Sequence, residues 1–265
     1  MSLTERSWTF DSNRAPLLAA LLPRLTARKI ALLACAFCRE VWHLLVDERC
    51  RKAVEACERG ADGTVAPKEY VRLASGIQIA EGELRAARAI FSNRRVGALQ
   101  GGQRQQARLK SAYFHAARTV RMGAGSTLYW LQYGRGKYKE VSPVLRAAES
   151  AVATLKRAAQ AEGQDPGVVM YRQRSAQCDL LRDLIGHLFR PVPPIDPPWL
   201  RWHDGCVRRI ATDIYDGNRW DDLPILGDAL EDAGCADREI LAHCRSGGVH
   251  RRGCWLVDAL LGKET

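Results

Sequence analysis

The 265-residue chain carries 40 Lys and Arg against 30 Asp and Glu, a formal net charge of +10 at pH 7 and a pI of about 9.3. Hydrophobic residues make up 46% and charged residues 26%, ordinary values for globular proteins that exclude a largely disordered chain. The chain contains no apolar run of about eighteen residues, and its N-terminus lacks an apolar segment of signal-peptide length. The sequence therefore predicts a cytoplasmic protein that does not span a membrane.

The nine cysteines are an odd number. Without an export signal, we expect reduced thiols rather than a disulfide framework.

An αα-hairpin over residues 27–59 is the first large predicted element. Thr26 is the expected N-cap of a helix over 27–46, whose apolar side chains recur on one face. Asp47 is the expected N-cap of a second helix over 48–59.

Long helices are predicted to follow in the region 66–189. They are interrupted by glycine-containing breaks and cover residues 66–91, 103–122, 143–161 and 168–189.

A proline-rich strap over 190–203 separates this region from the C-terminal end, because proline excludes helix in the interior of a segment. Shorter helices are predicted after the strap, over 204–216, 221–233, 237–245 and 254–261. No alternating strand pattern is present. The predicted fold is all-α, a multi-helix globule in which a C-terminal helical cassette, residues 204–265, packs on the helical region 1–189.

Four segments resemble a lineage-restricted family of planctomycete proteins. They are LLACAFCREVWHLLVDERCRKAVEACERGADG (32–63), LLRDLIGHLFRPV (180–192), DDLPILGDALEDAGCADREILAHCR (221–245) and HRRGCWLVDALLGKE (250–264). The resemblance covers both ends of the chain and little of residues 64–179. It implies no activity and no cofactor. The pattern of the family lacks cysteine at Cys50 and Cys57, which argues against a metal site that needs those two thiols.

The hairpin contains one candidate metal site. Its four thiols, on facing helices, are Cys35, Cys38, Cys50 and Cys57. Four thiolates suit tetrahedral zinc, but a CxxC inside a helix lacks the turn that zinc knuckles use. Packing of small side chains between two helices is the favoured alternative.

The C-terminal cassette contains a second candidate site, the group Cys235, His243, Cys244, His250 and Cys254. Zinc accepts such Cys and His mixtures, although these spacings match no standard zinc finger. Because neighbours such as His243 and Cys244 point to different faces, at most three or four of the five can converge. The alternative is that the cysteines are core residues and the histidines form hydrogen bonds.

A basic segment, residues 85–139, has twelve Lys and Arg and no Asp or Glu, with aromatic residues interleaved. Such a segment favours sequence-independent binding of nucleic acid. The candidate contact residues are Arg85, Arg88, Arg94, Arg95, Arg104, Arg108, Lys110, Arg118 and Arg121. The alternative is that this segment faces the acidic block 213–239 or a protein partner.

No nucleophile elbow, phosphate-binding loop or functional carboxylate pair is recognisable, so we assign no catalytic residue. The expected function is a non-enzymatic helical scaffold that binds a protein partner, with no cofactor required. The alternatives are the nucleic-acid binder and a zinc-stabilised module or metal-dependent hydrolase.

Overall fold

The computed structural model describes residues 4–10, 13–92, 101–128 and 143–263. Within these ranges the regular structure is helical, with twelve α-helices and no strand, which confirms the all-α prediction. None of the helices described is both long enough and apolar enough to cross a lipid bilayer.

Contacts between Cα atoms divide the chain into two units. We call Ser12–Gln177 the long-helix unit, and Met1–Asp11 together with Cys178–Thr265 the C-terminal unit. The division lies inside α9 (Pro166–Ile185), so the first half of this helix belongs to one unit and the second half to the other.

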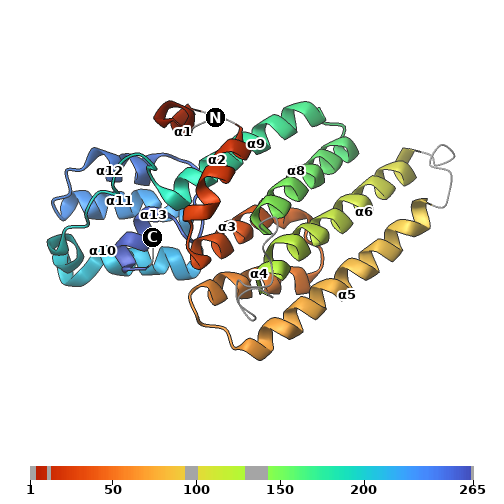
Figure 1. Cartoon of the computed structure of the whole chain (residues 1–265), viewed down its shortest axis with the longest axis horizontal. Coiled ribbons are helices and arrows are strands. Elements are labelled where there is room, and N and C mark those ends of the chain that lie inside the picture. Colours follow the sequence, from red (N-terminus) through yellow and green to blue (C-terminus); the bar gives the residue numbers. More distant parts are fainter. Residues whose placement is uncertain (1–3, 11–12, 93–100, 129–142, 264–265) are drawn as a thin grey trace. The chain divides into compact units, whose positions relative to one another are not determined.

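The long-helix unit is built around α6 (Gly101–Val120), which packs against α5 (Pro67–Ser92) and α8 (Pro143–Glu162) (Figure 1). The hairpin helices α3 (Ala27–Arg39) and α4 (Glu48–Ala61) pack against each other, and α3 also lies along α8.

Both predicted caps of the hairpin are present. The Thr26 side chain accepts from the Lys29 amide at 3.2 Å, and Asp47 accepts from the Arg49 amide at 2.9 Å. The predicted end of the first helix at residue 46 is wrong, because α3 ends at Arg39 and a 3₁₀ turn, Trp42–Leu44, follows. The apolar stripe continues through that turn and just past it, since Leu44 and Leu45 are both buried in the core.

The irregular section expected after residue 122 is helical as far as the structure describes it. A π-helical turn, Arg121–Gly125, follows α6 and brings Gly123 against α3 and α8. A Cβ at Gly123 would lie 2.8 Å from Cys38 Sγ and 2.9 Å from Ala147 Cβ. Glycine is therefore required for this close approach of three elements.

The C-terminal unit contains α1 (Glu5–Phe10), the end of α9, and helices α10 to α13. Helix α9 ends at Ile185, four residues before the predicted end, because Gly186 adopts a left-handed φ of +74°. Arg182 near this end donates to the Trp8 carbonyl at 2.7 Å and so ties α1 to α9.

The predicted strap is shorter than expected, since α10 (Pro197–Gly217) begins at its last two prolines. Four residues with non-helical backbone, from Trp202 to Gly205, interrupt α10. The remaining helices lie close to their predicted positions and are α11 (Leu223–Asp232), α12 (Arg238–Arg245) and α13 (Trp255–Leu261).

A hydrophobic core joins α10, α11, α12 and α13, with Tyr215, Trp220 and Trp255 as its largest members. Trp199 and Trp202 pack against it from the start of α10. Ile225 on α11 is 54% exposed and lies outside this core.

Candidate metal centre

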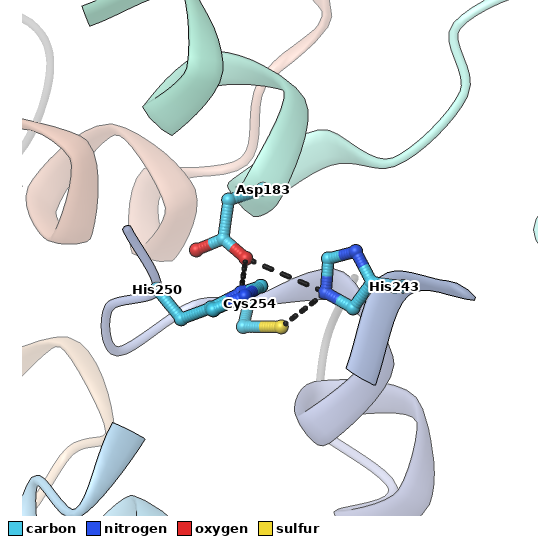
Figure 2. A group of neighbouring side chains, drawn as sticks. All are labelled: Asp183, His243, His250 and Cys254. Atoms are coloured by element: carbon cyan, nitrogen blue, oxygen red, sulfur yellow. Dashed lines mark hydrogen bonds and ion pairs between the residues drawn. The ribbon is translucent and has the colours of Figure 1, made fainter. Parts of the chain in front are cut away.

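Four side chains of the C-terminal unit converge on one point (Figure 2). Asp183 comes from the last turn of α9, His243 from the last turn of α12, and His250 from the loop before α13. Cys254 is the residue that precedes the first turn of α13. One nitrogen, oxygen or sulfur atom from each residue lies within 4.8 Å of the other three.

The distances within this cluster are short. His250 Nδ1 lies 2.6 Å from Asp183 Oδ1, and His243 Nε2 lies 3.5 Å from the same oxygen. His243 Nε2 is also 3.1 Å from Cys254 Sγ. The backbone amide of Arg251 donates to Asp183 Oδ2 at 3.1 Å. Asp183 is therefore the centre of the cluster.

The position of Asp183 is electrostatically costly. A carboxylate in the last turn of a helix meets the negative end of the helix dipole, and this one is only 5% exposed. Its stability in that place depends on the donors, or on a cation, that the cluster supplies.

The cluster is buried, and burial controls its protonation. Cys254 is fully buried, which raises the pKa of its thiol well above the ordinary value, with the Asp183 carboxylate adding to the effect. Burial lowers the pKa of His243 to about 4. A neutral imidazole is the form that coordinates metals. A thiol this inaccessible is excluded as a nucleophile.

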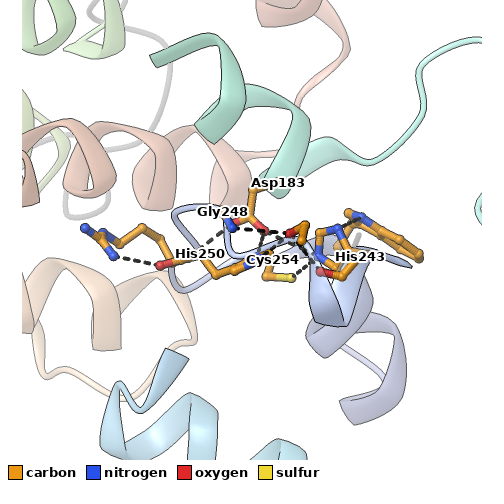
Figure 3. A network of polar contacts seen from close by, with 8 residues as sticks. Asp183, His243, Gly248, His250 and Cys254 are labelled. Atoms are coloured by element: carbon orange, nitrogen blue, oxygen red, sulfur yellow. Dashed lines mark hydrogen bonds and ion pairs between the residues drawn. The ribbon is translucent and has the colours of Figure 1, made fainter. Parts of the chain in front are cut away.

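A second layer of hydrogen bonds fixes the two imidazoles (Figure 3). Ser246 Oγ lies 3.3 Å from His250 Nε2 and also donates to the His243 carbonyl at 3.0 Å. The Trp255 indole donates to His243 Nδ1 at 3.2 Å. Gly247, with a φ of +61°, provides the turn that returns the chain from α12 to His250.

Three of the five residues of the predicted C-terminal site belong to this cluster, and two do not. Cys244 faces α11. A Cβ added to Gly227 of that helix would lie 2.8 Å from the Cβ of Cys244. Cys235 is buried in the same hydrophobic core. Both serve as small packing residues there, and burial raises the pKa of each thiol.

Asp183 was not among the predicted ligands, because it lies sixty residues before His243 and belongs to a different helical segment. Its only signal in the sequence is a carboxylate between the apolar residues Leu181 and Leu184 near a helix end.

The four thiols of the hairpin lie in the core of the long-helix unit. Cys35 Sγ contacts the Val54 carbonyl at 3.8 Å, whereas Cys38 Sγ contacts the Thr119 carbonyl, also at 3.8 Å. Cys35 and Cys38 therefore contact different helices, α4 and α6. In the described part of the chain, the Asp183 cluster is the one group of three or more potential metal-binding side chains, and Cys50 and Cys57 are not in it.

Part of the positive charge of the basic segment is offset by Glu81, which lies four residues before Arg85. Glu81 forms ion pairs with both Arg85 and Arg121, and Arg108 donates to the Gln160 carbonyl at 3.0 Å. Arg88 stacks on Phe114, with 4.7 Å between its Cζ and the ring centroid. Arg104, Lys110 and Arg118 lie on α6. Arg94 and Arg95 lie outside the described residues.

The acidic block 213–239 has partners inside the C-terminal unit. Arg219 pairs with Asp222 at 2.5 Å, and Arg245 pairs with Asp228 at 2.8 Å and with Glu231 at 2.5 Å. Part of its charge is thus offset without the basic segment.

The chain matches no protein-family model, no curated protein and no solved structure.

Proposed function

We propose that the C-terminal unit is a zinc-stabilised helical module, in which Asp183, His243, His250 and Cys254 hold one zinc ion. The observation that carries the proposal is the convergence of these four donors, from two helices, a loop and the N-cap of α13, at one buried point. Carboxylate oxygen, imidazole nitrogen and thiolate sulfur are the donor types that zinc takes in proteins, usually four at a time.

The charges of the donor set also favour a divalent ion. One carboxylate and one thiolate balance the two positive charges of zinc, and the two imidazoles bind in their neutral form. A neutral complex is the kind of ionic group that a site with such low exposure tolerates.

The role of the ion is structural rather than catalytic. Four protein donors complete a tetrahedral shell, whereas catalytic zinc sites keep one position for water or substrate. Burial of Cys254 and Asp183 also denies a substrate access to the ion. This argues against the metal-dependent hydrolase considered from the sequence.

A zinc centre at this place fastens elements that are distant in sequence. It joins the end of α9 to α12 and to the start of α13, beside the core that contains Trp255. A unit of short helices stabilised in this way supports the role of a non-enzymatic scaffold, which presents helical surfaces to a protein partner. Affinity capture with the full chain tests whether it binds such a partner.

Metal analysis tests the zinc proposal directly. Full-length protein without a polyhistidine tag should retain roughly one equivalent of zinc, and chelation should lower its thermal midpoint. Cys254→Ala should lose the metal, whereas Cys235→Ala, a matched buried cysteine outside the cluster, should keep it.

The rival arrangement is a metal-free hydrogen-bonded cluster. Zinc below about a tenth of an equivalent, both as purified and after addition of zinc, would establish that arrangement and reject the proposal.

A further inference from the structure

A groove in the long-helix unit carries a second inference, independent of the metal centre. Two adjoining hollows, of about 610 and 580 Å³, share four wall residues, Arg14, Glu149, Met170 and Arg174. The walls come from α2 (Arg14–Leu21), α8 and the first half of α9, all within one unit. The hollows thus form one groove, each part of a size that accommodates a small organic ligand.

The two ends of the groove differ in chemistry. One end presents Lys156 and Arg157 next to the shared Arg14 and Arg174. The other end presents Leu18 and Leu145 with Tyr171, a residue that is 67% exposed. Glu149 is the one carboxylate in either wall. The groove therefore suits a ligand that is strongly anionic at one end and flat or apolar at the other.

Two of the cations at the charged end, Lys156 and Arg174, form no ion pair with an acidic side chain in the described part of the chain. Both are exposed, and their side chains form no hydrogen bond there either. Arg157 donates to the Ala153 carbonyl at 2.8 Å, which leaves further N–H groups of its guanidinium for a ligand. Burial lowers the pKa of Arg157, and Arg88 and Arg118 nearby lower it further. Such a gathering of like charges favours an anion.

We infer that this groove binds a nucleoside phosphate, with its phosphates at Lys156, Arg157 and Arg174 and its base against Tyr171 and Met170. Guanidinium and ammonium groups form charge-assisted hydrogen bonds with phosphate oxygens. A phenol ring offers a stacking face to any base. The Glu149 carboxylate accepts hydrogen bonds from ribose hydroxyl or base amino groups.

Calorimetric titration of the full-length protein with ATP tests the inference. We expect saturable binding that Lys156→Ala and Arg174→Ala each weaken by at least about tenfold. Neither substitution breaks an interaction within the described chain, so the fold should be retained, which a circular-dichroism melt checks.

Matched controls lie on the same two helices. Arg146 on α8 and Arg172 on α9 are exposed cations outside both walls. Arg146→Ala and Arg172→Ala should leave ATP affinity within about twofold of wild type. Tyr171→Ala should weaken ATP but not pyrophosphate.

Three results would overturn the inference. One is the absence of ATP binding. Another is pyrophosphate binding as tight as ATP, which would reduce the groove to a site for bare phosphate. The third is an equal loss of affinity in the groove variants and their controls, with binding only to long oligonucleotides, which would indicate a diffuse polyanion surface instead.

Discussion

The indole Nε1 of Trp255 donates a hydrogen bond to Nδ1 of His243 at 3.2 Å. Because an indole N–H can only donate, this contact places the imidazole proton on Nε2, the nitrogen that faces Cys254 and Asp183. Zinc bound at Nε2 requires the opposite tautomer, with the proton on Nδ1. The metal-free and zinc-bound arrangements therefore cannot both keep this hydrogen bond.

Replacing Trp255 with phenylalanine should tighten zinc binding. The variant retains an aromatic ring in the core but removes the hydrogen bond that the metal has to break. Since such a bond contributes about 0.5–1.5 kcal/mol, we expect an affinity gain of about two- to tenfold, measured by competition with a chromophoric chelator.

Trp220→Phe is the control, because Trp220 lies in the same core and is not part of the cluster. In the wild-type protein, zinc should also shift the indole N–H resonance of Trp255. Weaker zinc binding by the Phe variant would mean that Trp255 holds His243 in place as a ligand, contrary to this prediction.

Gly186 is required where α9 ends against the Trp255 ring. It has a φ of +74°, and a Cβ there would lie 3.1 Å from Trp255 Cγ. Gly186→Ala should lower the free energy of unfolding by about 2–4 kcal/mol, combining a left-handed alanine with an overpacked contact. Urea unfolding followed by tryptophan fluorescence reports on this region, because five of the seven tryptophans lie in the C-terminal unit.

Gly234→Ala separates the cost of a left-handed alanine from the cost of the overpacked contact. Gly234 also has a positive φ, +93°, but nothing lies within 4 Å of its added Cβ. Its substitution should cost only about 1–2 kcal/mol. Equal costs for the two variants would show that the Trp255 contact contributes nothing.

Local signals in the sequence predicted the helices well, because caps and periodicity act over a few residues. Thr26 and Asp47 begin α3 and α4 as predicted. The end of α3 at Arg39 was not predictable from periodicity, since Leu44 and Leu45 are as buried in the 3₁₀ turn region as they would be in a continued helix. An apolar pattern indicates which side chains are buried. It does not indicate which backbone carbonyl accepts a hydrogen bond from each amide, and this is what distinguishes an α-helix from a 3₁₀ turn.

The candidate metal centre shows the limit of the same approach. His243, His250 and Cys254 were in the predicted set because they are close in sequence. Asp183 joins them only through packing of α9 against the C-terminal helices of its unit, and Cys244 leaves them because its side chain faces Gly227. Neither fact is encoded in local spacing.

Two glycines of the long-helix unit should respond to alanine with opposite signs. At Gly123 the new methyl meets Cys38 and Ala147 below normal contact distance, so we expect a loss of about 1–3 kcal/mol. Gly82 is exposed inside α5 with nothing within 4 Å of its Cβ, so alanine should stabilise by about 0.5–1 kcal/mol. Chemical denaturation of both variants measures the difference, and a common sign would contradict the packing described for the π turn.

His115 should make the long-helix unit less stable in mild acid. Burial lowers the pKa of this imidazole from 6.5 to about 4, and the nearby Arg157, Arg88 and Arg118 contribute. As pH falls below 6.5 the unfolded chain takes up the proton first, while the folded protein resists it until about pH 4. The stabilisation from the neutral His115 is therefore fully present above pH 6.5 and declines across that window.

His115→Gln removes the titrating group, so the slope of unfolding free energy against pH should become shallower between pH 6.5 and about 4. Urea titrations at several pH values measure that slope for wild type and variant. His43→Gln, which removes an exposed imidazole of the same unit, is the control for the loss of one histidine. If the His115 variant keeps the wild-type slope, neither burial nor the three arginines lower the pKa of His115 in the folded protein, contrary to this prediction.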